Sequence, residues 1–392
     1  MPVKSQSTSI YHVKGICHVK GIYHVKGWAR AFTDSVFDKM SKPISCLFFY
    51  ALVSFANQVE ASAVHQGVSV FSTYPSERLL NSCSAQQALP QQEQALKNTA
   101  EICMEDAISP DSFIKELSNS GQFYDLIPNG EGTDYELLIA NVGVSPNKYQ
   151  RHAKQFAEFT LQWRGIEIDS STFDIDALIN DSEQRGNQNT KNEAFLLVSR
   201  WLEHVNQARI FTSQFLFDAL EASNYDLGLQ VPETIGDFTK LDTQLFADPF
   251  SGVITRYTHS EFEDALIDVI VYPFIAPLSL KEAELLPNQL KSDLQKASAN
   301  AALQNLTLSQ VSPASPYTVN NKISGWRLGL SAASETSPTI FATTYVFKQQ
   351  DKIVKISTTF PPDFSDTIVN ELIVNVEVPQ ESAMMKKIRE LL

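Results

Sequence analysis

Hydrophobic and polar positions alternate along several stretches of the first half of the chain, a pattern that indicates strands with one buried face. The longest alternating stretch covers residues 156–168, and shorter ones cover residues 68–74, 122–127 and 134–142. A turn segment at residues 128–132, with one proline, one asparagine and two glycines, joins the last two stretches. We therefore predict a sheet in this region.

Apolar positions recur at helical spacing in three further stretches of the same region. Ser109-Pro110-Asp111 opens the first helix, since proline is tolerated in a first turn, and Gly121 ends it. The other two predicted helices cover residues 190–209 and 211–222. The predicted buried stripe of the helix at 190–209 is formed by Ala194, Phe195, Val198, Leu202 and Val205. Helices packed on a sheet predict an N-terminal α+β domain at residues 64–224.

The second half of the chain repeats the same kinds of pattern. The predicted strands cover residues 252–257, 266–274, 324–330, 341–347 and 353–360, the last two forming a hairpin over residues 348–352. A helix is predicted at residues 279–308, with Ser279 as its N-cap, Glu282 three residues on, and an interruption at Pro287. A closing helix at residues 363–376 should bury Phe364, Ile368 and Leu372. The predicted fold is therefore α+β with two domains, each an antiparallel sheet with helices packed on it, the second at residues 225–392.

The strands at residues 343–347 and 354–358, followed by a helix that begins with proline, resemble the Mog1/PsbP/DcrB-like group of α/β sandwiches. The resemblance covers residues 231–379 and lies in element order and strand character, without a diagnostic motif. Members of that group are mostly binding or accessory proteins, so the resemblance implies a non-catalytic role.

A secretory signal is predicted at residues 40–63. Lys42 precedes an apolar run at residues 44–56, and Ala61-Ser62-Ala63 offers a small-residue cleavage site after Ala61 or Ala63. The apolar run is shorter than the ~20 residues that span a bilayer, so we expect no stable membrane span after cleavage. The mature protein is therefore expected to be periplasmic or secreted, with the first 60 or so residues outside the fold.

Residues 1–39 contain a hexapeptide repeated three times, with histidines at positions 12, 18 and 24. We expect this segment to be translated from a start codon placed too early, with Met40 as the true start. The alternative is a metal-binding tract, because the spacing puts His12, His18 and His24 on one face of an extended strand.

Charge and cysteine content limit the possible partners and the compartment. The chain carries a formal net charge of −14, and its acidic surface argues against nucleic acid or anionic lipid as a partner. Cys83 and Cys103 are the two cysteines that follow the signal. In an oxidising compartment they should form a structural disulfide, because a redox-active pair usually has Cys-x-x-Cys spacing.

The sequence contains no recognisable catalytic motif. It has no phosphate-binding glycine loop, no nucleophile elbow and no His-Glu-x-x-His zinc motif. The histidines after the signal (His65, His152, His204 and His259) lack ligand spacing, and we interpret His204 as a surface or packing residue. Beside His259, Ser260, Glu261, Glu263 and Asp264 would allow acid–base chemistry only if a nucleophile lay nearby.

Two further features have a structural and a functional interpretation. Asp169, Asp174, Asp176 and Asp181 are expected to form a solvated loop, with calcium binding as the alternative. The pairs Trp163-Arg164 and Trp326-Arg327 are candidates for the rim of a ligand or partner site, or else for strand-end aromatics that close the core.

The sequence thus favours an exported, non-catalytic binding or accessory protein of the bacterial cell envelope, whose partner is another envelope protein. No catalytic, cofactor-binding or metal residues are assigned. One alternative is an exported hydrolase with dispersed residues, which would need Ser or Asp within hydrogen-bond reach of His152, His204 or His259. The other is a carrier of a small ligand or calcium.

Overall fold

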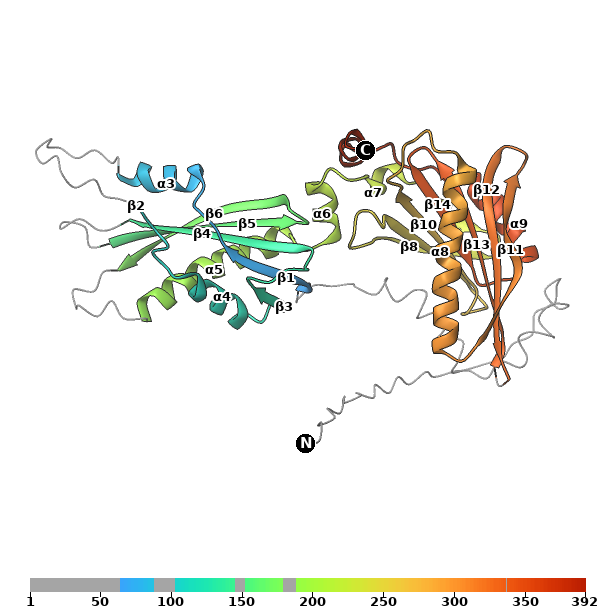
Figure 1. Ribbon diagram of the computed structural model, residues 1–392, viewed down its shortest axis with the longest axis horizontal. Coiled ribbons are helices and arrows are strands. Elements are labelled where there is room, and N and C mark those ends of the chain that lie inside the picture. Colours follow the sequence, from blue (N-terminus) through green and yellow to red (C-terminus); the bar gives the residue numbers. More distant parts are fainter. Residues whose placement is uncertain (1–63, 88–102, 145–151, 179–187, 336) are drawn as a thin grey trace, which may run out of the picture.

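The computed structural model describes residues 64–87, 103–144, 152–178, 188–335 and 337–392. It contains two separate sheets with helices packed on them (Figure 1), so the predicted α+β class with two sheets is confirmed. The predicted upstream segment, signal peptide and exclusion of the first 60 or so residues concern positions outside the described residues.

The first sheet has the strand order β3-β1-β4-β5-β6, with β2 paired to β4. Its strands are β1 Val64–Ser72, β2 Cys103–Glu105, β3 Phe123–Pro128, β4 Tyr135–Val144, β5 His152–Trp163 and β6 Ile166–Leu178. Strands β4, β5 and β6 are antiparallel as expected, but β1 runs parallel to both of its neighbours. The two strands on either side of the turn at residues 128–132 therefore do not pair with each other, because β1 lies between them.

The prediction of one strand over residues 156–168 is wrong, since the chain reverses at Arg164 and Gly165. Both residues have positive φ, +48° and +79°, as the tightest hairpin turns require. Apolar residues occupy odd positions from Ala157 to Trp163 and even positions at Ile166 and Ile168. This change of phase at Arg164 and Gly165 was the sequence signal of the reversal. Strand β6 therefore contains Asp169, Asp174 and Asp176, which were expected in a loop; Asp181 lies outside the described residues.

Helices α3 Glu77–Gln87, α4 Pro110–Asn119, α5 Gln188–Ala208, α6 Ser213–Ala219 and α7 Tyr225–Gly228 accompany the first sheet and the connection to the second. The fully buried Trp201 of α5 stacks on Phe159 of β5, with 5.2 Å between the ring centroids. Phe195, predicted to be buried, is 54% exposed. The other four predicted residues of the stripe are buried, and Leu197 and Trp201, which were not predicted, are buried with them.

The second sheet is antiparallel throughout and has the order β11-β12-β13-β14-β10-β9-β8-β7. Its strands are β7 Thr234–Ile235, β8 Phe238–Leu245, β9 Val253–His259, β10 Leu266–Pro273, β11 Thr307–Val319, β12 Ile323–Ser334, β13 Ser337–Gln349 and β14 Lys352–Thr358. The hairpin predicted over residues 348–352 is confirmed as the β13–β14 turn. Strands β7, β8 and β11 were not predicted.

Three helices belong to this half of the chain: α8 Glu282–Leu303, α9 Pro362–Ile373 and α10 Ala383–Glu390. Helix α8 starts after Lys281, not Ser279, and continues through Pro287. Pro287 is the sixth residue of α8, so its ring removes a single backbone hydrogen bond near the helix start. In α9, Ile368 and Leu372 are buried as predicted, but Phe364 is half exposed.

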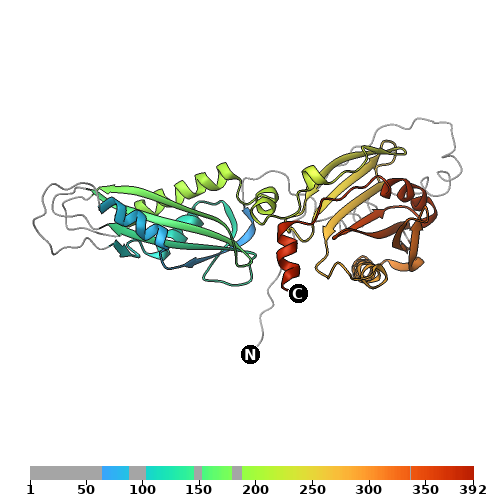
Figure 2. The ribbon, with the colours of Figure 1, turned by 90° about the horizontal axis from the view of Figure 1, so that it is seen from above.

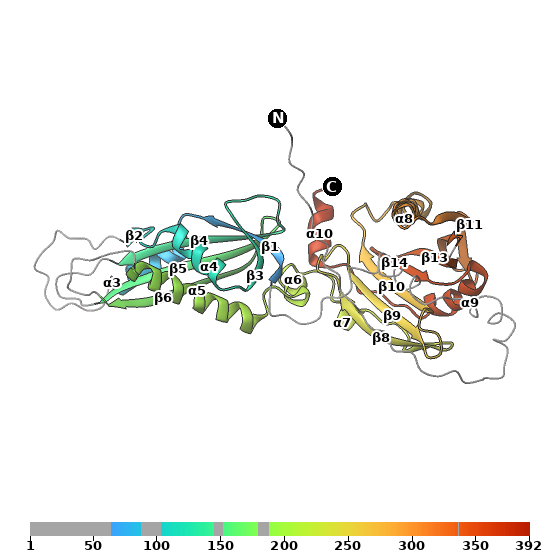
Figure 3. The same cartoon turned by 90° about the horizontal axis from the view of Figure 1, so that it is seen from below.

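Helices α8 and α9 pack on opposite faces of the second sheet (Figure 3). Successive strand residues point to opposite faces, so Tyr345 and Phe347 of β13 contact the α9 side while Val346 contacts the α8 side. Helix α10, which the sequence did not predict, lies between the two sheets (Figures 2 and 3). No helix in the described part of the chain is long and apolar enough to cross a membrane.

Candidate functional site

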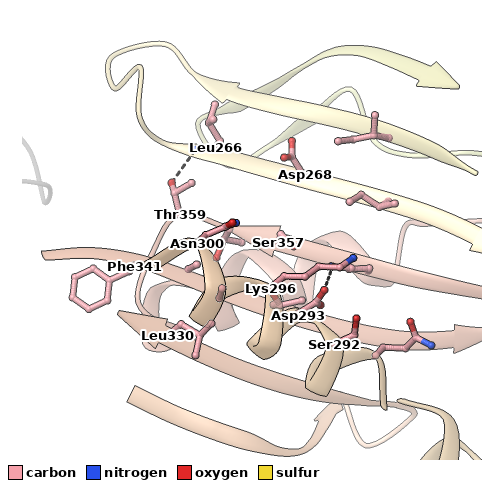
Figure 4. Close-up of a pocket in the computed structure, with 18 of the residues that line it drawn as sticks. Leu266, Asp268, Ser292, Asp293, Lys296, Asn300, Leu330, Phe341, Ser357 and Thr359 are labelled. Atoms are coloured by element: carbon pink, nitrogen blue, oxygen red, sulfur yellow. Dashed lines mark hydrogen bonds and ion pairs between the residues drawn. The ribbon is translucent and has the colours of Figure 1, made fainter. Parts of the chain in front are cut away.

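A groove of about 740 Å³ lies on the face of the second sheet that carries α8 (Figure 4). Strands β9, β10, β14 and β13 form its floor, and α8 forms one wall. The loop between β8 and β9, with Phe250 and Ser251, forms the other wall. The volume lies within the range of about 300–1,000 Å³ that is typical of ligand pockets.

Strand alternation explains why this face is only partly covered. In β10, Val269 and Val271 are fully buried against the α9 side, whereas Ile270 and Tyr272 point to the groove and are half buried. Helix α8 covers β12 and the neighbouring end of the sheet, where its Leu286 and Leu290 are fully buried. The rest of this face remains open as the groove.

Two polar contacts fix the α8 wall against the floor. The Lys355 ammonium of β14 donates to Asp293 Oδ1 of α8 at 2.6 Å, and the Tyr272 hydroxyl donates to Gln289 Oε1 at 2.9 Å. Burial, together with the nearby Asp293 carboxylate, raises the pKa of Tyr272 well above its ordinary value of 10.0. Tyr272 therefore stays a neutral hydrogen-bond donor.

A second ion pair lies beside these contacts on the floor. Arg256 of β9 donates to both carboxylate oxygens of Asp268 of β10, at 2.7 and 2.9 Å. The hydrogen bonds that Arg256 donates to the Asp268 carboxylate raise the pKa of Arg256. The charges within two ion pairs thus neutralise each other here, Arg256 with Asp268 and Lys355 with Asp293. Lys296 of α8 also lines the groove, and no described residue forms an ion pair with it.

The first sheet holds the loop wall in place. Phe250 stacks on Trp163, with centroids 6.2 Å apart, and Arg164 Nη2 donates to Asp248 Oδ2 at 3.0 Å. Arg164 also bonds Asp134 and lies 4.4 Å from the centroid of the Trp163 ring. The predicted rim pair Trp163-Arg164 therefore supports the wall from behind, with Trp163 only 3% exposed.

The other predicted rim pair divides between the two faces of the second sheet. Trp326 packs against the cluster under α8. Arg327 points to the α9 side, where it bonds Asp366 at 2.5 Å and lies 5.5 Å from the ring centroid of Tyr317. The two pairs belong to different sheets, and a role in contacting a ligand or partner stays a prediction for all four residues.

His204 is the described histidine that lies within hydrogen-bond reach of both a serine and an aspartate. Its Nε2 is 3.0 Å from Ser171 Oγ and 3.2 Å from Asp169 Oδ1. A Ser-His-Asp relay needs the serine and the aspartate on opposite ring nitrogens, whereas here both contact Nε2. His259 accepts the Glu261 backbone N–H at Nδ1 and lies against the ring of Phe262. The side chain of His152 lies outside the described set.

The strand aspartates form ion pairs rather than a metal cage. Lys154 Nζ lies 3.0 Å from Asp174 and 3.8 Å from Asp176. Within the described ranges, no group of three or more His, Cys, Asp and Glu residues is arranged to hold a metal ion. The predicted Cys83–Cys103 disulfide is confirmed; it joins α3 to β2 across 20 positions of sequence.

Comparison with known proteins gives no family assignment. No family model matches the chain, and no curated protein matches it. Among solved structures, PsbP of Synechocystis sp. PCC 6803 is 13% identical, covers 38% of this chain and 92% of its own, and has a TM-score of 0.27. Two further structures are each 9% identical to this chain: the immunity protein TplEi of the Pseudomonas aeruginosa T6SS, with a TM-score of 0.21, and the Tle4–Tli4 complex, with a TM-score of 0.22. Each match covers 62% of this chain and 74% of the matched chain. Likeness at this level supports no inference about family or function.

The residues of the groove were not recognised from the sequence. They come from six strands, one helix and a loop between positions 246 and 359. The two residues of each ion pair, Arg256–Asp268 and Lys355–Asp293, lie on different elements. The available signal was the few polar residues within two largely apolar strands, namely Asp268 in β10 and Lys355 and Ser357 in β14. A fully covered strand would not need those residues.

Proposed function

We propose that this protein is an exported, non-catalytic binding protein of the bacterial cell envelope, and that it acts by contact with another envelope protein through the groove beside α8. The observation that supports this most is the groove itself. It has a half-buried floor, a wall fixed by Lys355–Asp293 and a second wall supported by the first sheet. A site built on rigid elements needs little reorganisation to bind.

Export is supported by the signal pattern at residues 40–63 and by the disulfide, because disulfides persist in oxidising compartments. The non-catalytic role is supported by the position of Ser171 and Asp169 on the same nitrogen of His204. We keep the domain division at residues 64–224 and 225–392 as part of the proposal. The groove belongs to the second domain, and the first domain supports its loop wall.

The test uses a photoreactive amino acid at two exposed positions of α8. Ser292 lines the groove and Ser298 does not, and both side chains are solvent exposed. With the full-length chain expressed in its source organism, irradiation should give an adduct with one protein, identified by mass spectrometry, from position 292 and not from 298. Equal adducts from both positions, or a full-length product retained in the cytoplasm, would overturn the proposal.

A further inference from the structure

We infer that the groove binds an extended segment of the partner protein, about five residues long, with apolar side chains and one carboxylate that meets Lys296. This inference deepens the proposed function and rests on it. Three properties of the groove support it: its length, the chemistry of its lining and its single unpaired charge.

The length of the groove corresponds to a short extended peptide. Its lining spans Leu266 to Tyr272 along β10, which is about 20 Å at ~3.3 Å per strand residue. Along α8 it spans Gln289 to Asn300, which is about 16 Å at ~1.5 Å per helical residue. An extended segment of about five or six residues covers these distances.

The lining alternates between apolar patches and groups that both donate and accept hydrogen bonds. Ile254, Ile270 and Ile340 supply apolar surface for side chains. Hydroxyl and amide groups border them, from Ser292, Asn300, Ser331, Thr344 and Ser357. A peptide main chain carries N–H and C=O groups that must be paired when they leave water. An acyl chain has no such groups, so the lining favours a peptide over a lipid tail.

The charged residues of the groove indicate that the bound segment carries a carboxylate. Arg256, Asp268, Lys355 and Asp293 are already paired, at 2.7 and 2.6 Å. Lys296, which lines the groove on α8 (Figure 4), forms no ion pair within the described part of the chain. Lys296 is itself solvent exposed. A carboxylate of the bound segment would supply its partner, and a charge-assisted hydrogen bond is stronger than a neutral one.

The test is a selection of random peptides of about seven residues, displayed on phage, against the purified exported protein. We expect enriched sequences with apolar residues around one aspartate or glutamate. Their affinity should fall about tenfold or more for Lys296→Glu, which places like charges together. The control is Lys291→Glu, which makes the same charge change at an exposed position of α8 outside the groove and should leave affinity unchanged.

A second pair of variants tests the place of binding without touching the core. Ser292→Trp fills the groove and should abolish peptide binding, whereas Ser298→Trp adds the same ring outside it and should not. An unfolding temperature equal to that of the unaltered protein would show that each of the four variants has folded. Laurate serves as the competitor that represents an acyl chain.

The possible outcomes separate this inference from the proposed function. Enriched peptides without a carboxylate, or peptides that bind the Lys296→Glu variant normally, would overturn the inference. The proposed function would still stand if the photoreactive residue at position 292 gave its adduct. Binding of laurate with no enriched peptide would also overturn it. Loss of both the peptide and the adduct would overturn both.

Discussion

Gly252 has the most constrained backbone position in the wall of the groove. Its φ is +69°, and a Cβ atom there would lie 1.9 Å from the Val271 carbonyl oxygen and 2.8 Å from Tyr272 Cα. Only glycine allows the chain to leave the β8–β9 loop and pair immediately with β10. The loop that carries Phe250 therefore depends on the absence of one side chain.

We predict that Gly252→Ala destabilises the protein by more than about 2 kcal/mol, because backbone strain and a collision with backbone atoms add together. Gly236→Ala is the matched control. Gly236 also has positive φ, +54°, but nothing lies within 4 Å of its added Cβ. Urea unfolding should show a loss of about 1 kcal/mol there, from conformation alone. Equal losses at the two positions would contradict the proposed collision.

The sequence indicated which residues to consider for a site, but not which distant residues they contact in the folded chain. Trp163 and Arg164 were singled out as neighbours in the sequence, but their contacts, Phe250 and Asp248, lie more than 80 positions away. The error at Phe195 has a similar cause. Phe195 and Leu197 both fit a helical stripe through Val198 and Leu202, and only the packed sheet decides which of them is buried.

At the level of elements, the disulfide connects a helix beside the first sheet, α3, to a short strand of that sheet, β2. Helix α3 packs through Leu79 and Cys83 on a small cluster with Val142 and Phe156, and β2 has three residues. The Cys83–Cys103 bond closes a loop across 20 positions. The cross-link should stabilise the folded state mainly by restricting the unfolded chain.

We predict that replacing both cysteines by alanine lowers the free energy of unfolding by about 3 kcal/mol. Because the bond lies in the first sheet, the contacts of Lys355, Asp293 and Arg256 in the groove should be unaffected. Peptides selected on the unmodified protein should therefore bind the double variant with the same affinity. Urea unfolding and fluorescence anisotropy measure the two quantities, and a loss of binding in the folded variant would contradict this separation.

Long elements with regular periods were predictable, and short or irregular ones were not. Helices α4, α5 and α9 and the β13–β14 hairpin were found because their spacing and end signals agree. Strand β11 was missed because Pro313 and Pro316 and two register shifts break its pattern, which is common for an edge strand. The start of α8 was misplaced because Ser279 is a good N-cap by type, whereas Lys281 occupies the position.

At the level of the whole molecule, six tyrosines are held neutral by the fold. Burial is the main cause of a raised pKa for Tyr135, Tyr225, Tyr257, Tyr272, Tyr317 and Tyr345, and Tyr317 reaches about 12. A folded-state pKa above the unfolded value of 10.0 means that the stabilisation is complete below pH 10 and is lost as the pH rises through the folded pKa.

We predict that the protein unfolds cooperatively above about pH 10 and that these six tyrosines ionise together with that unfolding. Tyrosinate absorbance and near-ultraviolet circular dichroism, followed in one titration, should change at the same pH for this group. Complete ionisation of all tyrosines while the dichroism stays native would show that the side chains are more accessible than the structure indicates.

Helix α10 contacts both halves of the molecule, which explains how two separate cores can behave as one body. Met384 and Met385 are buried in the core of the first sheet. On the other side, Arg389 donates to the carbonyl oxygens of Phe274 and Ala276. The Arg389 guanidinium also contacts Glu381 and lies 3.8 Å from the buried Asp351, which pairs with Lys352 at 2.5 Å.

We predict a single unfolding transition for the unaltered protein in scanning calorimetry, because loss of either core removes the support of α10. Arg389→Ala should remove charge-assisted hydrogen bonds worth about 3 kcal/mol and weaken the contact between α10 and the second sheet. Its unfolding should therefore separate into two transitions. Lys387→Ala is the control, since Lys387 pairs with Glu221 at the exposed surface of the same helix. If Arg389→Ala still unfolds in one transition at the unaltered temperature, the coupling does not pass through α10. The contacts of Trp163 with Phe250 and of Arg164 with Asp248 also join the two sheets.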